Sequence, residues 1–366
     1  MILHRYFAKR YLVSFALVSA MFFGLLGVMD LFEQARDVSE QEGVTGGDII
    51  ALTLLNAPAN FYEFLPLFVI LSSVNLFVGL GRSSEMVVTR ASGRSAIRAL
   101  AAPVAVVTII GLIAITVLNP LVAATTRETE DRVTRIEDRG ASVLSVDAGG
   151  LWLRQGGPEG QSVIRAGRAN LDGTELSGVS FILFSPEGLP LRRVDARRAK
   201  LADGRWTLTD AKEWPLGDAS VPEAEATEHD TFYIASNLTA AQIRDSFGAP
   251  SSIPIWELPR FIDRLEAAGF SAVRHQVWLQ SELAKPLFLI AMMLIGAAFT
   301  LRHQRGRRIG LMVLLSICLS FGLYFIRNFA IVLGENGQIP VALAAWAPPL
   351  AGVALSLAML LHQEDG

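Results

Sequence analysis

Cysteine, histidine and charge are scarce in this sequence of 366 residues. The one cysteine, Cys318, cannot form an internal disulfide, and its apolar surroundings predict a small buried hydrophobe. The five histidines are scattered, so no pair has the spacing of a metal site. Charged residues make up 18% of the chain and hydrophobic residues 51%. These proportions are unusual for a soluble protein and indicate an integral membrane protein.

Several motifs of enzymes are also missing. The sequence contains no GxxxxGK[ST] phosphate loop, no HExxH and no GxSxG. The chain therefore has no phosphate-loop ATPase site, and we expect no catalytic residue, metal or cofactor. Its net charge of −3 does not provide the basic surface that nucleic-acid binding requires.

Apolar runs are abundant instead. A helix needs about 20 apolar residues to cross a bilayer, and six runs are long enough to do so. They lie at about Tyr11–Met29, Asn60–Gly81, Ala99–Val122, Val273–Leu301, Ile309–Leu333 and Pro340–Leu361. The first could be a cleaved signal peptide, since Val18-Ser19-Ala20 loosely fits a cleavage site. Because the run continues well past Ala20, we favour a retained helix.

The sequence changes character between the third and fourth runs. Short alternating stretches are separated by turn residues there, and Asp203-Gly204 before RWTLTDAKEW is a strong hairpin signal. Several such strands predict an antiparallel sandwich or barrel-like domain. We therefore divide the chain into three helices with their loops (1–126), a β domain (127–270) that ends in a helix around Leu258–Leu265, and three more helices (271–366).

The distribution of charge predicts the topology. With three spans on either side of the β domain, the basic segments Met1–Arg10, Arg82–Arg98 and Arg302–Arg308 fall on one side. The acidic segment Asp30–Asp48 and the β domain fall on the other. Since Lys and Arg accumulate on the cytoplasmic face, we expect both termini in the cytosol and the β domain outside.

The loop between the second and third spans has the sequence GRSSEMVVTRASG, Gly81–Gly93. Met86, Val87 and Ala91 could form an apolar helix face beside Glu85 and Arg90, as in a short helix that lies in a partner's groove. The alternative is an ordinary cytoplasmic loop whose arginines only obey the topology rule.

Glu63, Lys285 and Arg327 are charged residues that interrupt the apolar runs. A charge inside a membrane is costly unless it is paired, hydrated or able to reach the interface. Lys285 and Arg327 could therefore reach the interface, or Lys285 could pair with Glu63 and hold helices together. They could also bind the phosphates of a lipid.

Residues 82–93 resemble the coupling helix of the lipopolysaccharide-export permease family, LptF/LptG, with its motif SE-apolar-apolar-x-x-A-x-G. The start Ile2-Leu3-His4-Arg5-Tyr6, the 3+3 arrangement and the stretch WLQSELAKPL in the fourth span are also similar to that family, and GLWLRQ and WELPRFIDRLEAAG resemble its LptG side more than its LptF side. The resemblance implies six transmembrane helices with a periplasmic β-jelly-roll domain between the third and fourth.

The resemblance also implies a function. It suggests an inner-membrane subunit, without an ATPase site of its own, that exports lipopolysaccharide from the inner membrane. Its partners would be a cytosolic LptB-like ATPase dimer, an LptF-like permease, a bitopic LptC-like protein and a periplasmic LptA-like bridge. The residues carried over as ATPase contacts are Arg82, Ser84, Glu85, Met86, Val87 and Arg90.

The chain departs from the family at the end of the first span, where some members carry a lysine. Asp30 and Glu33 stand there, and Arg36 is the first cation. We therefore expect substrate phosphates to meet Arg327 and Lys285, with Arg36 as a further candidate. Two other functions remain open: an envelope structural or sensor protein whose β domain binds polymer or proteins, and a permease driven by an ion gradient. The latter requires a deeply buried carboxylate, and Glu63 lies too near the surface.

Overall fold

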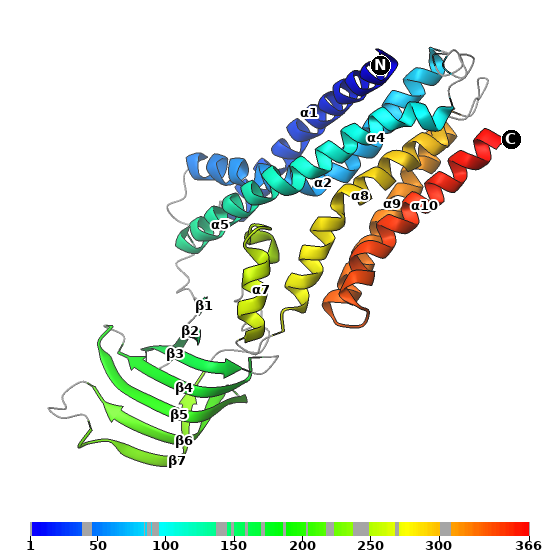
Figure 1. Cartoon of the computed structure of the whole chain (residues 1–366). Helices are drawn as coiled ribbons and strands as arrows, with labels where there is room; N and C mark the ends of the chain where they lie inside the picture. The colour runs from blue at the N-terminus through cyan, green and yellow to red at the C-terminus, as the bar shows by residue number, and fades with distance from the viewer. Residues whose placement is uncertain are drawn as a thin grey trace. The chain divides into compact units, whose positions relative to one another are not determined.

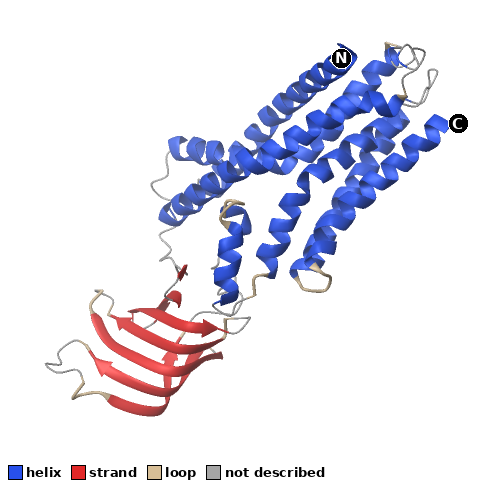
Figure 2. Cartoon of the chain, viewed as in Figure 1, coloured by secondary structure: helices blue, strands red, loops and turns tan. Residues whose placement is uncertain are grey.

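A computed structural model of the whole chain divides into two compact units. The helical unit contains Met1–Arg132, Ser251–Trp256 and Val273–Gly366, and the sheet unit contains Val133–Pro250 and Glu257–Ala272. Figures 1 and 2 show the long helices in the first and the strands in the second. The structure describes residues 2–38, 46–83, 85, 89, 95–136, 145–147, 150–157, 160–169, 173–185, 188–202, 204–216, 223–236, 249–267, 271–300 and 309–365.

Six helical stretches are long and apolar enough to cross a membrane, as the sequence predicts. The first two are α1 (Ile2–Val38) and α2 (Gly46–Arg82). The third joins α4 (Ala96–Ile113), a π-helical segment (Ala114–Leu118) and α5 (Asn119–Ile136). The last three are α8 (Val273–Thr300), α9 (Ile309–Glu335) and α10 (Val341–Asp365).

The first two helices are longer than their apolar runs. Helix α1 continues to Val38 and α2 begins at Gly46, so the described parts of the acidic segment Asp30–Asp48 are helical. Hydropathy shows where a helix can cross a bilayer, but it does not mark where the helix ends. Residues such as Glu, Gln and Ala have good helix propensity and extend a helix into water.

The spans differ in how much this chain covers them. In α8, 67% of the apolar window is buried inside the protein, whereas the fraction is 17% in both α1 and α9. Helix α8 is close to α4, since a Cβ on Gly111 would lie 2.7 Å from the Cα of Pro286. Cys318 on α9 is exposed, not buried as expected. The apolar run around it is covered only in part by the other helices of this chain.

The strands form a seven-stranded antiparallel sheet in the order β1-β2-β3-β4-β5-β6-β7. Their bounds are β1 Ser145–Asp147, β2 Gly150–Gly157, β3 Gly160–Ala169, β4 Glu175–Phe184, β5 Pro190–Ala202, β6 Arg205–Pro215 and β7 Thr227–Ala235. Strands β5 and β6 form the hairpin that Asp203-Gly204 predicts, and β2–β3 and β4–β5 are further antiparallel pairs. The sequence did not predict β1 and β7.

The sheet is curved (Figure 2), and most of its buried side chains are apolar. Trp206 and Leu208 are fully buried on one face of β6, as the alternation predicts. Gln155 on β2 accepts a hydrogen bond from Trp206 Nε1 and another from Ser236 Oγ, which follows β7. These bonds join strands from opposite parts of the sheet order. Gly204, in the β5–β6 turn, has φ +70°, which suits glycine.

The expected helix after the sheet is α7 (Leu258–Ala267). Leu258, Ile262 and Leu265 are buried along one side of it, at helical spacing. A short 3₁₀ turn, Pro250–Ser252, precedes it.

Candidate functional site

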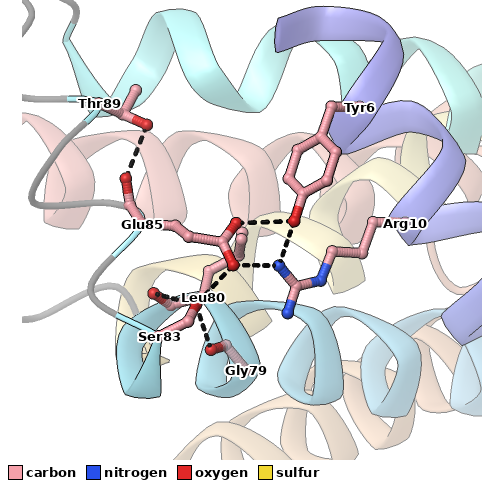
Figure 3. Close-up of polar contacts among 7 residues, drawn as sticks. All are labelled: Tyr6, Arg10, Gly79, Leu80, Ser83, Glu85 and Thr89. Atoms are coloured by element: carbon pink, nitrogen blue, oxygen red, sulfur yellow. Dashed lines mark hydrogen bonds and ion pairs between the residues drawn. The ribbon is translucent and has the colours of Figure 1, made fainter.

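The segment after α2 brings a carboxylate to the N-terminal end of α1. Helix α2 ends at Arg82, and Ser83 N donates to Gly79 O to close its last turn. Glu85 and Thr89 have helical backbone, and Thr89 Oγ1 donates to Glu85 O at 2.8 Å. The side chain of Glu85 points from this segment toward α1 (Figure 3).

Three donors meet on the Glu85 carboxylate. Oε1 accepts from Arg10 Nη1 at 2.6 Å and from Ser83 Oγ at 2.7 Å, and Oε2 accepts from Tyr6 OH at 2.9 Å. Arg10 Nη1 also donates to Tyr6 OH at 2.7 Å. Tyr6 and Arg10 are four residues apart on α1, so they share one helix face. We call Tyr6, Arg10 and Glu85 the terminal cluster.

The terminal cluster stabilises the charged form of Glu85. Partial burial alone would raise the pKa of this carboxyl, but the hydrogen bonds from Arg10, Ser83 and Tyr6 outweigh it and lower the pKa. Arg10 and Glu85 remain 34% and 32% exposed. The site is therefore an ionised carboxylate that is held in place and is still accessible.

Two of the six residues that we expect to contact the ATPase are among the described residues. Glu85 lies in the terminal cluster, and Arg82 is exposed in the last turn of α2. Ser84, Met86, Val87 and Arg90 lie outside the described residues, as does the basic loop 302–308.

A second cluster lies inside the helical unit. Lys285 Nζ forms an ion pair with Glu282 Oε1 at 2.9 Å, one turn away on α8, and their side chains are 8% and 1% exposed. Tyr62 OH on α2 donates to Glu282 Oε2. The Lys285 ammonium also lies 3.3 Å from the centre of the Tyr62 ring. We call Tyr62, Glu282 and Lys285 the interior cluster.

The interior cluster is connected to two further segments. Asn119, at the start of α5, donates to Glu282 Oε2 at 3.4 Å. Its Oδ1 accepts from the backbone N of Ile255 at 2.9 Å. A π-helical segment directly precedes Asn119, and such segments occur often at functional sites. Of the open alternatives for Lys285, pairing inside the protein therefore occurs, and the partner is Glu282, not Glu63.

Arg327 on α9 stands near the interior cluster. Its guanidinium lies 5.0 Å from the centre of the Phe288 ring, and Phe288 is one turn beyond Lys285 on α8. Among the described residues, Arg327 donates to Asn328 at 3.5 Å and joins no ion pair. Arg36 is exposed in the last turn of α1. It takes no part in the contacts described above for Lys285 and Arg327.

Sequence reasoning missed five residues of these clusters. They are Tyr6, Arg10, Tyr62, Asn119 and Glu282. One signal was available, because Glu282 and Lys285 are three residues apart, a spacing at which opposite charges meet on a helix. The contacts of Glu85 with α1, and those of Glu282 with Tyr62 and Asn119, join residues that are at least 75 positions apart, and no local pattern indicates them.

The chain matches known proteins over nearly its whole length. The model of the family described as "Lipopolysaccharide export system permease LptF/LptG" matches residues 5–362. A protein of Escherichia coli (strain K12) named "Lipopolysaccharide export system permease protein LptG" is 26% identical over 372 residues, which cover 99% of each chain. A protein of Haemophilus influenzae with the same name is 23% identical over 375 residues, again 99% of each chain.

Proposed function

Because the chain belongs to the lipopolysaccharide export permease family LptF/LptG, we propose that it is the membrane subunit of an ATP-driven lipopolysaccharide exporter. It takes the lipid from the inner membrane and passes it to a periplasmic β-jelly-roll bridge that leads toward the outer membrane. A cytosolic, LptB-like ATPase dimer supplies the energy, since this chain has no phosphate-loop sequence.

The proposed orientation places both termini in the cytosol. The start of α1, the end of α2, the start of α4 and the end of α10 lie at one end of the helical unit (Figure 1). The segments Met1–Arg10 and Arg82–Arg98 at this end are rich in Arg and Lys, which favours the cytosolic side. The sheet unit, inserted between the third and fourth spans, is then periplasmic.

The observation that carries the proposal is the terminal cluster. Three donors hold Glu85 in one place, yet about a third of the side chain stays exposed. A fixed, ionised carboxylate at a membrane protein's cytosolic end can receive a cation of a docked ATPase. We propose that Arg82, Ser84, Met86, Val87 and Arg90 complete this docking surface around Glu85.

The exposed faces of α1 and α9 support further membrane partners. Most of the apolar window of each helix is not covered by this chain, and such faces must meet lipid or protein. We propose that an LptF-like permease and the helix of a bitopic, LptC-like protein cover part of them. In the described sheet β1 and β7 are edge strands, and an edge can pair with a strand of an LptA-like bridge.

The proposed substrate site includes Arg327, Lys285 and Arg36. A cavity of about 110 Å³ lies between α2, α8 and α9, and its mostly apolar wall includes Ile70, Met292 and Tyr324. Tyr324 is one turn before Arg327 on α9. A cation one helical turn from the wall of an apolar cavity suits a lipid with a phosphate and acyl chains. Arg327 is the strongest candidate, because it joins no ion pair among the described residues, whereas Lys285 has Glu282.

Co-purification tests the proposed function. The tagged chain is extracted gently from its native membrane, and bound subunits and ATPase activity are compared for wild type, Glu85→Arg and Glu33→Arg. Glu33 is an exposed carboxylate near the other end of α1, so its reversal is a matched control. We expect an ATPase with wild type and with Glu33→Arg, and its loss with Glu85→Arg. A folded chain that binds no ATPase in any form would instead favour the envelope structural or sensor protein.

A further inference from the structure

Helix α1 contributes two of the three donors to Glu85, namely Tyr6 and Arg10. Neither belongs to residues 82–93, the segment that resembles a coupling helix. We propose that Tyr6 and Arg10 are positioning residues of the coupling device: they orient the Glu85 carboxylate toward a cation of the ATPase and transmit its displacement to α1. This inference rests on the proposed function. It also gives a role to the start of the chain, where Tyr6 ends the motif Ile2-Leu3-His4-Arg5-Tyr6.

The hydrogen bonds define what a partner can do at Glu85. An ionised carboxylate has about four acceptor positions. Among the described residues, Arg10 and Ser83 use two on Oε1, and Tyr6 uses one on Oε2. Counting these described donors alone, one acceptor position on Oε2 remains for a partner. A cation of the ATPase can therefore add a single hydrogen bond, whereas a bidentate arginine would have to displace Tyr6 or Arg10.

The two positioning residues also restrain each other. Tyr6 OH donates to Glu85 and accepts from Arg10, so the three side chains form a closed ring of hydrogen bonds (Figure 3). The Arg10 guanidinium lies 5.7 Å from the centre of the Tyr6 ring. Its other side faces α2, where a Cβ on Gly79 would be 3.5 Å from Arg10 Nη2. Glu85 cannot shift without moving Arg10 or breaking this ring.

Helix α1 can carry such a displacement because it is fixed to α2 directly beyond the cluster. Tyr11 OH donates to Val69 O at 3.3 Å, and Ser14 Oγ donates to Ser72 O at 3.0 Å. Both contacts are buried. Glu85, the start of α1 and the second half of α2 are thus connected to one another by side-chain contacts. A force applied at Glu85 reaches α1 through side chains as well as through the chain itself.

The ring contributes little to stability, which makes its function testable. Arg10 and Glu85 are each about a third exposed, and ion pairs at this level of exposure add little to folding. Variants of Tyr6 and Arg10 are therefore expected to fold and assemble. Any effect on transport then reports on coupling.

The experiment measures coupling in the assembled exporter. The complex of this chain with its ATPase and second permease is placed in lipid vesicles that contain lipopolysaccharide, and lipid released and ATP hydrolysed are measured together. The variants are Arg10→Gln, Arg10→Lys and Tyr6→Phe. Lys9→Gln is the matched control, because Lys9 is an exposed cation beside Arg10 in the sequence.

We expect all four variants to retain the ATPase subunit. Arg10→Gln lowers the lipid released per ATP by about tenfold, as loss of a hydrogen bond to a charged group implies. Tyr6→Phe lowers it by about threefold, since Arg10 still holds Oε1. Arg10→Lys recovers most of the ratio because an ammonium can donate to both acceptors, and Lys9→Gln leaves it unchanged.

Failure of this inference differs from failure of the proposed function. A normal ratio of lipid to ATP in Arg10→Gln overturns the positioning role, while the proposed function stands if Glu85→Arg still loses the ATPase.

The exchange of both charges, Arg10→Glu with Glu85→Arg, adds a second readout. It keeps an ion pair inside the chain but presents a cation to the ATPase, so we expect no ATPase to bind. Full transport by this double variant would overturn the inference, because it would make the internal pair sufficient.

Discussion

Two clusters in the helical unit contain the same three chemical groups, a glutamate, a cation and a tyrosine, yet they differ in burial. In each cluster the tyrosine donates to the carboxylate and its ring lies near the cation. The side chains of the ion pair in the terminal cluster are 34% and 32% exposed, and those in the interior cluster are 8% and 1% exposed.

Burial determines what each cluster contributes. Removal of one partner from a buried ion pair leaves a charge that nothing compensates, whereas an exposed pair is replaced by water at little cost. Neither charge of the interior cluster can therefore be removed alone without a large loss of stability. The terminal cluster is nearly dispensable for folding, and its carboxylate can receive a partner. The following predictions test this difference.

The largest effect is expected for Glu282→Ala. It leaves the Lys285 ammonium buried without a counter-ion and should lower the free energy of unfolding by about 3–5 kcal/mol. The double variant Glu282→Leu with Lys285→Met removes both charges and should regain most of that loss. Glu85→Ala should cost less than about 1 kcal/mol. Thermal unfolding of the purified protein in detergent measures all three, and equal losses for Glu282→Ala and Glu85→Ala would contradict the comparison.

Tight packing beside the interior cluster predicts the next effect. Pro286 follows Lys285, and a Cβ on Gly111 would lie 2.7 Å from its Cα. Gly111→Ala should therefore separate α4 from α8 and cost about 1–3 kcal/mol. Gly322→Ala on α9 is the control, because a Cβ there would meet nothing within 4 Å. If both variants unfold at the same temperature, the packing around Lys285 is looser than the structure indicates.

Local patterns in the sequence predicted the main features of the fold. They did not predict where the helices end, or the strands that have few apolar residues. An apolar run of about 20 residues and a turn such as Asp203-Gly204 are visible in a short stretch of sequence. Strand β7, TEHDTFYIA, has few apolar residues and depends on pairing with β6. Helix α1 continues beyond Met29 because the residues there have good helix propensity in water. The apolar pattern that identifies a membrane span does not reveal this.

The candidate site was predicted only where it is local. Glu85 could be found because it lies in a motif. Its donors Tyr6 and Arg10 are at least 75 residues away in the sequence, and only the packing of α1 against α2 brings them to it. Lys285 could be recognised as an unusual charge in an apolar run. Its partner Glu282 was missed, and the distance to Glu63 in the folded chain could not be judged from the sequence. Burial of a charge is a property of packing between helices, and the sequence of one helix does not contain it.

The two tyrosines allow a comparison that changes a single hydroxyl group. Tyr62→Phe removes a donor from a carboxylate that is 1% exposed, so it should cost about 1–3 kcal/mol. Tyr6→Phe removes a donor that water can replace, and its cost should be below about 0.5 kcal/mol. Thermal unfolding again gives the values. A larger loss for Tyr6→Phe would mean that the terminal cluster is also structural.

The smallest effect is a dependence on pH, and it follows from the lowered pKa of Glu85. A carboxyl with a lower pKa in the folded state stabilises the protein above its unfolded pKa, and this contribution disappears as the pH falls through the folded pKa. Glu85→Gln should therefore be less stable than wild type near neutral pH, by under about 1 kcal/mol. The difference should vanish in acid, below the ordinary glutamate value of 4.5. Unfolding of both proteins between pH 7 and acid pH checks this. In acid both side chains are uncharged. A stability difference that persists there would show that the amide weakens the cluster by its shape and hydrogen bonding, not by its lack of charge.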